Sequence, residues 1–277
     1  METIVDDFFE GAEKRLVIKF NVDDNNYYQT DIWENILQDI NCHPLGIIKN
    51  EHQIMFLLAE SVLVVTHHHV ILKTCGKTTP LNLVGYLSEK NINISDVEYS
   101  HPNFIRPMEQ PLLYHSFENQ IKFINSIINQ NFNFLMKAHM NYYFTNKITD
   151  NLEIILWDFT WDANIIRQFK NLLKGWVIDD FKFEPDGHSI NSFMDDKYIT
   201  IHVTPNKSCS YLSIECNDPN YFFDIIPLFL KLSPQKIGFF TNRYDKDVEY
   251  HLSFINNDNL TNSDSYIEDH IYVKHYF

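Results

Sequence analysis

The sequence predicts an α+β fold in which antiparallel sheets are flanked by helices, with an internal pseudo-repeat. Two observations predict this class. Most strand-like segments are separated by short turns, which favours antiparallel pairing. The order of strands and helices in the first half also recurs in outline in the second half, and no linker rich in Gly, Ser or Pro divides the two. We therefore expect a single domain over residues 1–277.

The first half starts with an acidic segment that leads into a strand, because apolar residues alternate at Leu16, Ile18 and Phe20. The next apolar residues recur at helical spacing: Trp33, Ile36, Leu37 and Ile40. We expect a helix there, with Asp31 as its N-cap.

Residues 56–65 form a mostly apolar run that we interpret as one strand with Glu60 and Ser61 at its centre. A second run, 70–76, follows three consecutive histidines at 67–69. Two strands joined by a short polar loop would bring Ser61 and Cys75 close together. The histidine triplet resembles a metal site, but adjacent strand residues point to opposite faces, so we interpret it as a solvated turn.

The remaining elements follow from the same patterns. Residues 88–111 carry three prolines and other turn residues, which predicts a long ordered loop with short strands. Apolar periodicity predicts helices at residues 117–128, 162–173 and 221–232. Strands are expected at residues 132–144, 152–159, 198–205, 209–215, 236–242 and 266–276, the last of them after a loop at 256–265.

The composition is that of a folded protein with an acidic surface. Hydrophobic residues make up 44% and aromatic residues 15% of the chain, which excludes a wholly disordered protein. With 37 acidic and 22 basic residues, the net charge of −15 disfavours nucleic acid and membrane as partners and matches a cationic small molecule. The four cysteines have no CxxC spacing, and neither a signal peptide nor an apolar run of ~18 residues is present. We expect a cytoplasmic protein with free thiols and no metal.

Five short motifs occur in an order and spacing that resemble one known family. They are Phe-Glu-Gly-Ala-Glu-Lys at 9–14, Leu-Ala-Glu-Ser at 58–61, Ile-Leu-Lys-Thr-Cys-Gly at 71–76, Phe-Glu-Pro-Asp-Gly-His-Ser at 183–189 and Ile-His-Val-Thr-Pro at 201–205. Together they span most of the chain, which resembles eukaryotic-type S-adenosylmethionine decarboxylase. The resemblance implies a four-layer αββα sandwich of two antiparallel sheets flanked by helices.

The resemblance also implies a self-processing enzyme that breaks its own chain between Glu60 and Ser61. The serine hydroxyl would attack the preceding carbonyl, an ester would replace the amide, and β-elimination would leave a covalent pyruvoyl group. The products, a β chain of residues 1–60 and an α chain of residues 61–277, would stay associated as a monomer or a homodimer. The pyruvoyl carbonyl would form a Schiff base with S-adenosylmethionine and promote its decarboxylation to the aminopropyl donor for spermidine and spermine synthesis.

The roles of individual catalytic residues follow from their matching positions in the family. His202 would remove the α-proton of Ser61 during elimination, a role that suits a neutral imidazole. Ser189 would hydrogen-bond the oxyoxazolidine intermediate. Cys75 would return a proton to the substrate carbon after CO2 leaves, because a thiol is mostly protonated at neutral pH.

The substrate contacts are implied in the same way. Phe9 and Phe183 would stack on the two faces of the adenine. Glu10 and Glu13 match acidic residues of the family's active site and would face the sulfonium and the amine. Asn206 stands where the family has a glutamate that binds the ribose hydroxyls, and an amide hydrogen-bonds a diol without the help of a charge.

The family's site for the activator putrescine is only partly present. Lys73, Glu153 and Glu215 match parts of that diamine site and would be its remnants, but Val17 and Thr149 stand where two acidic residues are expected. A buried diamine would lack compensation for the loss of its hydration. The sequence therefore predicts weak or absent activation by putrescine.

Departures from the family pattern leave two alternatives open. Val62 replaces the serine that usually follows the motif serine, and with Asn206 and Val17 it motivates an inactive regulatory homologue that binds an active partner. Asn206 and Asp186 motivate a pyruvoyl decarboxylase that acts on another amino acid.

Overall fold

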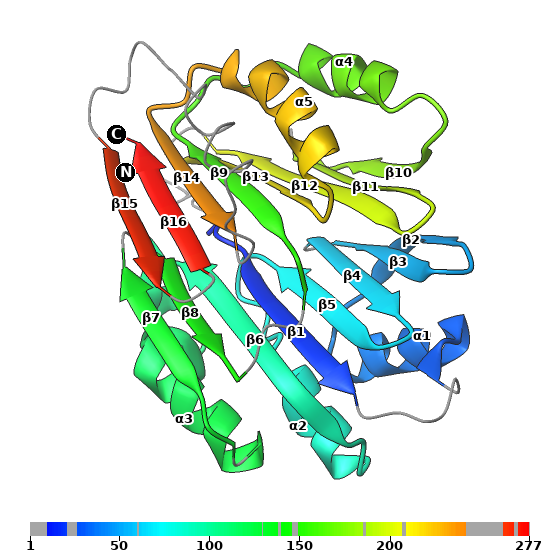
Figure 1. Ribbon diagram of the computed structural model, residues 1–277, viewed down its shortest axis with the longest axis vertical. Coiled ribbons are helices and arrows are strands. Elements are labelled where there is room, and N and C mark those ends of the chain that lie inside the picture. The colour runs from blue at the N-terminus through cyan, green and yellow to red at the C-terminus, as the bar shows by residue number, and fades with distance from the viewer. Residues whose placement is uncertain are drawn as a thin grey trace, which may run out of the picture.

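Runs of buried β-branched and aromatic residues build two eight-stranded antiparallel sheets that pack face to face in the computed structural model (Figure 1). The structure describes residues 10–276 except 21–26, 60, 129, 138–139, 146–148, 185–186, 207–208, 242–262 and 269–270. The α+β class predicted from the sequence is confirmed. Across the described residues, every helix is too short or too polar to cross a membrane.

The first sheet has the order β2-β3-β4-β5-β1-β6-β8-β7. Its strands are β1 (Lys14–Phe20), β2 (Pro44–Lys49), β3 (Gln53–Leu58), β4 (Ser61–Thr66), β5 (His69–Thr74), β6 (Ile94–Pro102), β7 (Asn133–Lys137) and β8 (Met140–Phe144). The second sheet has the order β10-β11-β12-β13-β9-β14-β16-β15. Its strands are β9 (Leu152–Trp157), β10 (Val177–Lys182), β11 (His188–Met194), β12 (Lys197–Pro205), β13 (Ser210–Cys216), β14 (Lys236–Thr241), β15 (Ser263–Glu268) and β16 (Ile271–Tyr276).

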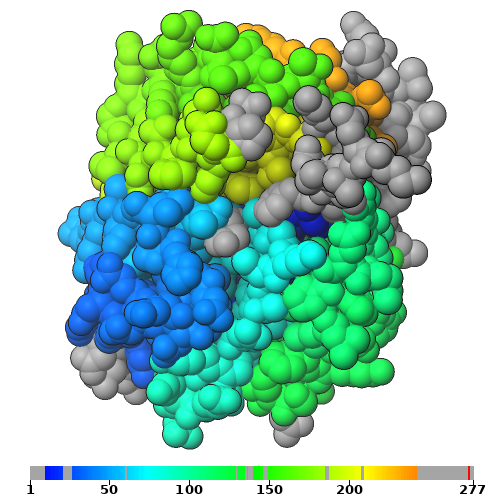
Figure 2. Space-filling view, turned by 180° about the vertical axis from the view of Figure 1, so that it is seen from behind, coloured from blue at the N-terminus to red at the C-terminus, as the bar shows by residue number. Residues whose placement is uncertain are grey.

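The two orders are the same when each strand of the first sheet is matched with the strand eight places later, so the expected pseudo-repeat is confirmed. In Figure 2 the first half, coloured blue to green, forms the lower part of the molecule, and the second half, lime to orange, forms the upper part.

Helices cover the outer face of each sheet (Figure 1). The first sheet carries α1 (Thr30–Asp39), α2 (Asn82–Glu89) and α3 (Phe117–Ile128), and the second carries α4 (Asn164–Leu172) and α5 (Pro219–Leu230). Alternation along β1 shows how the layers form: Leu16 and Ile18 pack under the helices, whereas Val17 packs between the sheets. The resulting order of layers is helix, sheet, sheet, helix.

The interior between the sheets is apolar at two places and charged between them. One apolar cluster surrounds Val17 and Ile71, and the other surrounds Tyr142 and Phe240, whose rings lie 5.0 Å apart. Buried charged and polar side chains from both sheets lie in the same interlayer. Several residues expected from the sequence to form the site belong to this polar part, among them Glu13, Ser61 and His202.

The interpretation of residues 56–65 as one strand is wrong. β3 ends at Leu58 and β4 begins at Ser61, and these two residues are antiparallel partners across a tight reversal. Both strands are buried, so the apolar run continues through the reversal and carries no alternation that would reveal it.

Residues 88–111 are also not a long loop. α2 extends into the start of this range, and β6 crosses the sheet between β1 and β8. The polar residues of β6, among them Asp96, Glu98 and Ser100, are buried, which is why the strand resembles a loop in sequence.

Two further expectations are wrong in detail. Asp31 lies in the first turn of α1, and the N-cap is Gln29, whose side chain makes no capping hydrogen bond. The final strand expected at 266–276 is a pair, β15 and β16, joined as an antiparallel hairpin.

The strands β2, β10 and β11 have no counterpart among the sequence expectations. On β2 the exposed positions carry the apolar residues Leu45 and Ile47, and on β10 most residues are exposed, so neither strand shows an apolar face turned inward.

Candidate active site

Ser61 lies at the start of β4, buried between the two sheets. Its side chain donates a hydrogen bond to Glu13 Oε1. Its backbone φ of +156° lies just inside the range that L-residues rarely adopt, so the turn holds this residue under some strain. Glu60 lies outside the described residues.

Glu13 directly precedes β1 and joins the two sheets. Its second carboxylate oxygen accepts a hydrogen bond from Ser213 on β13 and lies 3.4 Å from Lys73 Nζ on β5. Burial by itself would raise the pKa of Glu13, but the charge of Lys73 and the two hydroxyl donors outweigh it, so the pKa lies below 4.5. The buried carboxylate therefore stays ionised.

His202 and Ser189 are neighbours on the second sheet. They are antiparallel partners on β12 and β11, and His202 Nδ1 lies 2.8 Å from Ser189 Oγ. On its other side His202 is the register partner of Ser213, which connects it to Glu13. Burial lowers the pKa of His202 below 6.5 against the pull of Glu13, so the imidazole is neutral at neutral pH.

Cys75 follows β5 and lies one residue beyond Thr74, the register partner of Ser61. The turn after it is tightly held: Gly76 N donates to the Glu10 carbonyl at 2.9 Å, and Gly76 O accepts from Lys14 Nζ at 2.7 Å. Gly76 has a φ of +60°, which favours glycine. The expected proximity of Cys75 and Ser61 is thus produced by pairing of β4 with β5.

Lys14 is a buried cation that the sequence expectations missed. Its ammonium lies 3.4 Å from Gln110 Oε1 and 5.1 Å from the centre of the Phe104 ring, and it has no exposed surface. Burial lowers its pKa from 10.5 to about 8. A signal was present, because two basic residues, Lys14 and Arg15, directly follow Glu13 at the start of an apolar strand.

Glu10 is buried beside the loop that leads to the short helical turn Pro107–Glu109. Its Oε2 accepts hydrogen bonds from the backbone N–H groups of Ile105 and Arg106, at 2.8 and 3.2 Å. Burial raises its pKa above 4.5 in spite of these donors. The carboxylate thus ties this loop to the segment that carries Glu13.

The residues expected to hold the nucleoside are described only in part. Phe9 lies outside the described residues. Phe183 is half-buried after β10, its N–H donates to Gly187 O at 2.7 Å, and its ring lies 4.9 Å from that of Phe181. Asn206 follows β12, where its N–H donates to Thr204 O at 2.9 Å.

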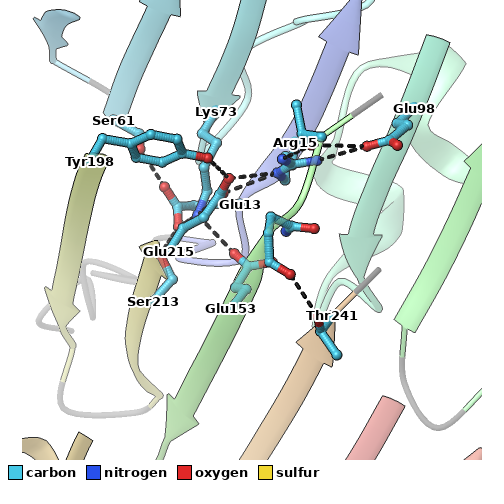
Figure 3. A network of polar contacts seen from close by, with 12 residues as sticks. Glu13, Arg15, Ser61, Lys73, Glu98, Glu153, Tyr198, Ser213, Glu215 and Thr241 are labelled. Atoms are coloured by element: carbon cyan, nitrogen blue, oxygen red, sulfur yellow. Dashed lines mark hydrogen bonds and ion pairs between the residues drawn. The ribbon is translucent and has the colours of Figure 1, made fainter. Parts of the chain in front are cut away.

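The three residues that the sequence led us to expect as remnants of a diamine site, Lys73, Glu153 and Glu215, form a buried charge cluster with Arg15 and Glu98 (Figure 3). Lys73 Nζ lies 2.8 Å from Glu153 Oε1 and 3.3 Å from Glu215 Oε2. Arg15 Nε lies 3.0 Å from each oxygen of Glu215, and its terminal nitrogen lies 3.5 Å from Glu98 Oε2. Arg15, which the sequence expectations also missed, therefore supplies a second cation among these carboxylates.

Arg15 also contacts Thr149, one of the two positions at which the sequence resemblance leads us to expect an acidic residue. Its second terminal nitrogen donates to Thr149 Oγ1 at 3.2 Å, and Val17 lies two residues further along β1 in the apolar part of the interlayer. Burial raises the pKa of Glu153 above 4.5, whereas Arg15 and Lys73 outweigh burial and lower that of Glu215. Glu153 is thus the carboxyl of this pair that binds a proton more readily.

The histidine triplet does not converge on one point. His67 and His68 are exposed in the turn after β4, and the ring of His67 stacks on Tyr28 at 4.0 Å. His69 begins β5, where burial lowers its pKa to about 4. The described part of the chain contains no group of three or more His, Cys, Asp or Glu side chains suited to a metal ion.

Comparison with known proteins gives a consistent result over most of the chain. The profile of the adenosylmethionine decarboxylase family matches residues 6–155 and 135–270. The S-adenosylmethionine decarboxylase proenzyme of Drosophila melanogaster is 33% identical over a match of 261 residues, with 76% of this chain and 75% of that protein covered. The proenzyme of Dictyostelium discoideum is 27% identical over 256 residues, with 76% and 68% covered.

The fold is similar to that of a solved structure, the Trypanosoma brucei AdoMetDC-delta26 monomer. The TM-score is 0.52 at 20% sequence identity, and the match covers 80% of this chain and 97% of that one. At this identity the likeness concerns the fold alone.

Proposed function

The chain belongs to the adenosylmethionine decarboxylase family of enzymes, and on that basis we propose that it decarboxylates S-adenosylmethionine after cleaving itself between Glu60 and Ser61. The observation that carries the proposal is the buried Ser61 hydroxyl, bonded to Glu13 at the reversal between β3 and β4. The product would be the aminopropyl donor for polyamine synthesis. Cleavage would divide the domain into residues 1–60 and 61–277.

The residues around Ser61 fit a pyruvoyl group generated from that serine. Ser61 is buried and its backbone is strained. Cys75 follows its register partner Thr74, and the neutral His202 interacts with Glu13, the hydrogen-bond partner of Ser61. Such a group, once formed, supplies a carbonyl that binds the substrate amine and accepts electrons from the breaking carboxylate bond. Exclusion of water by the two sheets would protect that carbonyl.

His202 would act as the base that removes the Ser61 α-proton. Its neutral state at neutral pH leaves one ring nitrogen able to accept a proton. Ser189 lies 2.8 Å from Nδ1 and would fix the orientation of the ring. The pairing of β11 with β12 sets this geometry before cleavage.

Cys75 would be the acid that returns a proton to the substrate carbon. Its turn is held by Lys14 and by the Glu10 backbone, so the thiol has a fixed position near the start of β4. A proton donor in a fixed position favours protonation of one substrate carbon over another.

Substrate binding would draw on the negative side chains of the site and of the whole chain. Glu10 and Glu13 would face the sulfonium and amine charges, and the net charge of −15 would attract the cation over longer distances. Phe183, together with Phe9, would stack on the adenine, and Asn206 would bond the ribose hydroxyls.

Intact-mass measurement of the purified protein tests the processing. We expect two chains of 60 and 217 residues (277 minus 60), with a hydrazine adding to a carbonyl on the larger one. Ser61→Ala should remain a single chain. A wild-type preparation that stays at 277 residues would overturn the proposal.

Release of labelled CO2 from carboxyl-labelled S-adenosylmethionine tests the substrate. A protein that cleaves and carries the carbonyl but releases no CO2 would contradict this substrate and favour another amino acid. That outcome would leave the processing intact.

A further inference from the structure

The hydroxyl of Ser61 is paired with a carboxylate before any bond is cleaved. Glu13 accepts a hydrogen bond from Ser61 on one oxygen and from Ser213 on the other. Ser61 is 3% exposed and Glu13 is 2% exposed, so water has little access to the contact. A hydroxyl becomes an effective nucleophile only as its proton leaves, and the acceptor of that proton decides the rate.

The nearby histidine is engaged elsewhere. His202 Nδ1 lies 2.8 Å from Ser189 Oγ, and Nε2 lies 3.3 Å from Thr204 Oγ1. Both ring nitrogens thus face hydroxyls of the second sheet, while the hydrogen bond of Ser61 runs to Glu13. Position favours Glu13 as the group that takes the hydroxyl proton.

We propose that Glu13 is the general base of the self-cleavage, an inference that rests on the function proposed above. The Glu13 carboxylate takes the proton from Ser61 Oγ as this oxygen bonds to the carbonyl carbon of the preceding residue. When the adduct collapses, the bond from that carbon to the Ser61 nitrogen breaks, and the nitrogen takes the proton from Glu13. The products are an ester and an amine, and Glu13 is a carboxylate again.

Lys73 keeps this base ionised inside the protein. Its ammonium lies 3.4 Å from Glu13 Oε2 and is held from the other side by Glu153 at 2.8 Å. A carboxylate with a low pKa is a weak base, so its effect comes from its place on the hydroxyl rather than from its strength. The same cation balances the charge that burial would otherwise penalise.

The hydrogen bond between Ser61 and Glu13 also explains how Glu13 would act both in self-cleavage and in substrate binding. Elimination would remove the hydroxyl of Ser61, and Glu13 would lose that donor. A buried carboxylate that loses a donor gains from a replacement. The α-ammonium of the substrate is a donor of the right charge, so Glu13 would first activate Ser61 and then bind the substrate.

The test compares the cleavage rates of intact chains made by cell-free synthesis and followed on denaturing gels. Glu13→Gln keeps the size of the side chain and removes its charge, and we expect cleavage about 100-fold slower or worse. Glu13→Asp retains a carboxylate and should recover part of the rate. Asp96→Asn is the control, because it makes the same carboxylate-to-amide change at another buried acid, one that accepts a hydrogen bond from Thr145; its rate should stay near that of the wild type.

Hydroxylamine, which cleaves esters, locates the blocked step. His202→Ala should accumulate the ester and yield two chains with hydroxylamine, whereas Glu13→Gln should not. Wild-type rates in Glu13→Gln, or an ester in that variant, would overturn the role of Glu13. If Glu13→Gln does not fold, a wild-type rate in Glu13→Ala, which also lacks the carboxylate, overturns it instead. A wild-type chain that never cleaves would overturn the proposed function itself.

Discussion

The two sheets share one strand order but carry opposite charges at equivalent central positions. In the first sheet Arg15 of β1 pairs with Lys73 of β5, and in the second Glu153 of β9 pairs with Glu215 of β13. These side chains meet between the sheets, at 3.0 Å for Arg15 with Glu215 and 2.8 Å for Lys73 with Glu153. The repeated topology brings the pairs opposite each other, and the difference in charge makes the two inner faces complementary.

The two central hairpins show a second difference. Leu58 and Ser61 close the turn between β3 and β4, and Met194 and Lys197 close the equivalent turn between β11 and β12. Asp195 and Asp196 in the second turn are exposed, whereas Ser61 is buried against Glu13. The two equivalent turns thus differ in environment: the β3–β4 turn leads into buried polar side chains, whereas the β11–β12 turn is exposed to water.

Replacement of Arg15 should disrupt the charge complementarity between the two sheets more than any other change. Arg15→Met leaves Glu215 and Glu98 buried without this cation, and we expect a loss of about 3–5 kcal/mol in the free energy of unfolding. Urea unfolding in a Ser61→Ala background, which keeps the chain intact, measures it. The double variant Arg15→Met, Glu215→Leu should recover part of the loss; a double variant no more stable than the single one would contradict this account.

Acid should weaken the charge contacts between the two sheets, with a smaller loss in the free energy of unfolding than the Arg15 substitution causes. The pKa values of Glu13 and Glu215 lie below 4.5 in the folded state, so their contribution is present above that value and is lost as the pH falls through their folded-state pKa. We expect the free energy of unfolding to fall by about 1–3 kcal/mol between pH 6 and pH 3. Glu215→Gln should reduce this slope, and an unchanged slope would exclude Glu215 as a source.

Putrescine should have the smallest effect. Arg15 already places a cation among the carboxylates, and Val17 and Thr149 provide no further negative charge. We expect the rate of CO2 release to be nearly unchanged when putrescine is added, because a buried diamine would lack compensating partners. A clear increase in rate, measured at saturating substrate, would show that the cluster still accepts a diamine.

Much of the fold could be predicted from local sequence patterns, whereas the charge cluster could not. Helical spacing identified α1 and α3, and alternation at Leu16, Ile18 and Phe20 identified β1. Arg15 and Glu215 are 200 residues apart, and nothing near either residue indicates the other. Their meeting depends on how the two sheets pack, which local periodicity does not encode.

The site residues illustrate the same division. The motifs indicated Ser61, His202 and Ser189, and the structure brings the last two into contact through the pairing of β11 with β12. The role of β6 was hidden because its polar residues resemble those of a loop and are buried by partners far away in sequence. Periodicity reports a strand reliably only when one of its faces meets water.

The position of β1 bears on what the proposed cleavage would produce. β1 lies between β5 and β6, with hydrogen bonds on both sides, although it would belong to the shorter chain and both neighbours to the longer one. The two chains would therefore form a heterodimer whose strands alternate within one sheet, and neither chain could dissociate without breaking that sheet. Their unfolding midpoint should rise with protein concentration, and recovery from denaturant should follow second-order kinetics, because association would replace a covalent link.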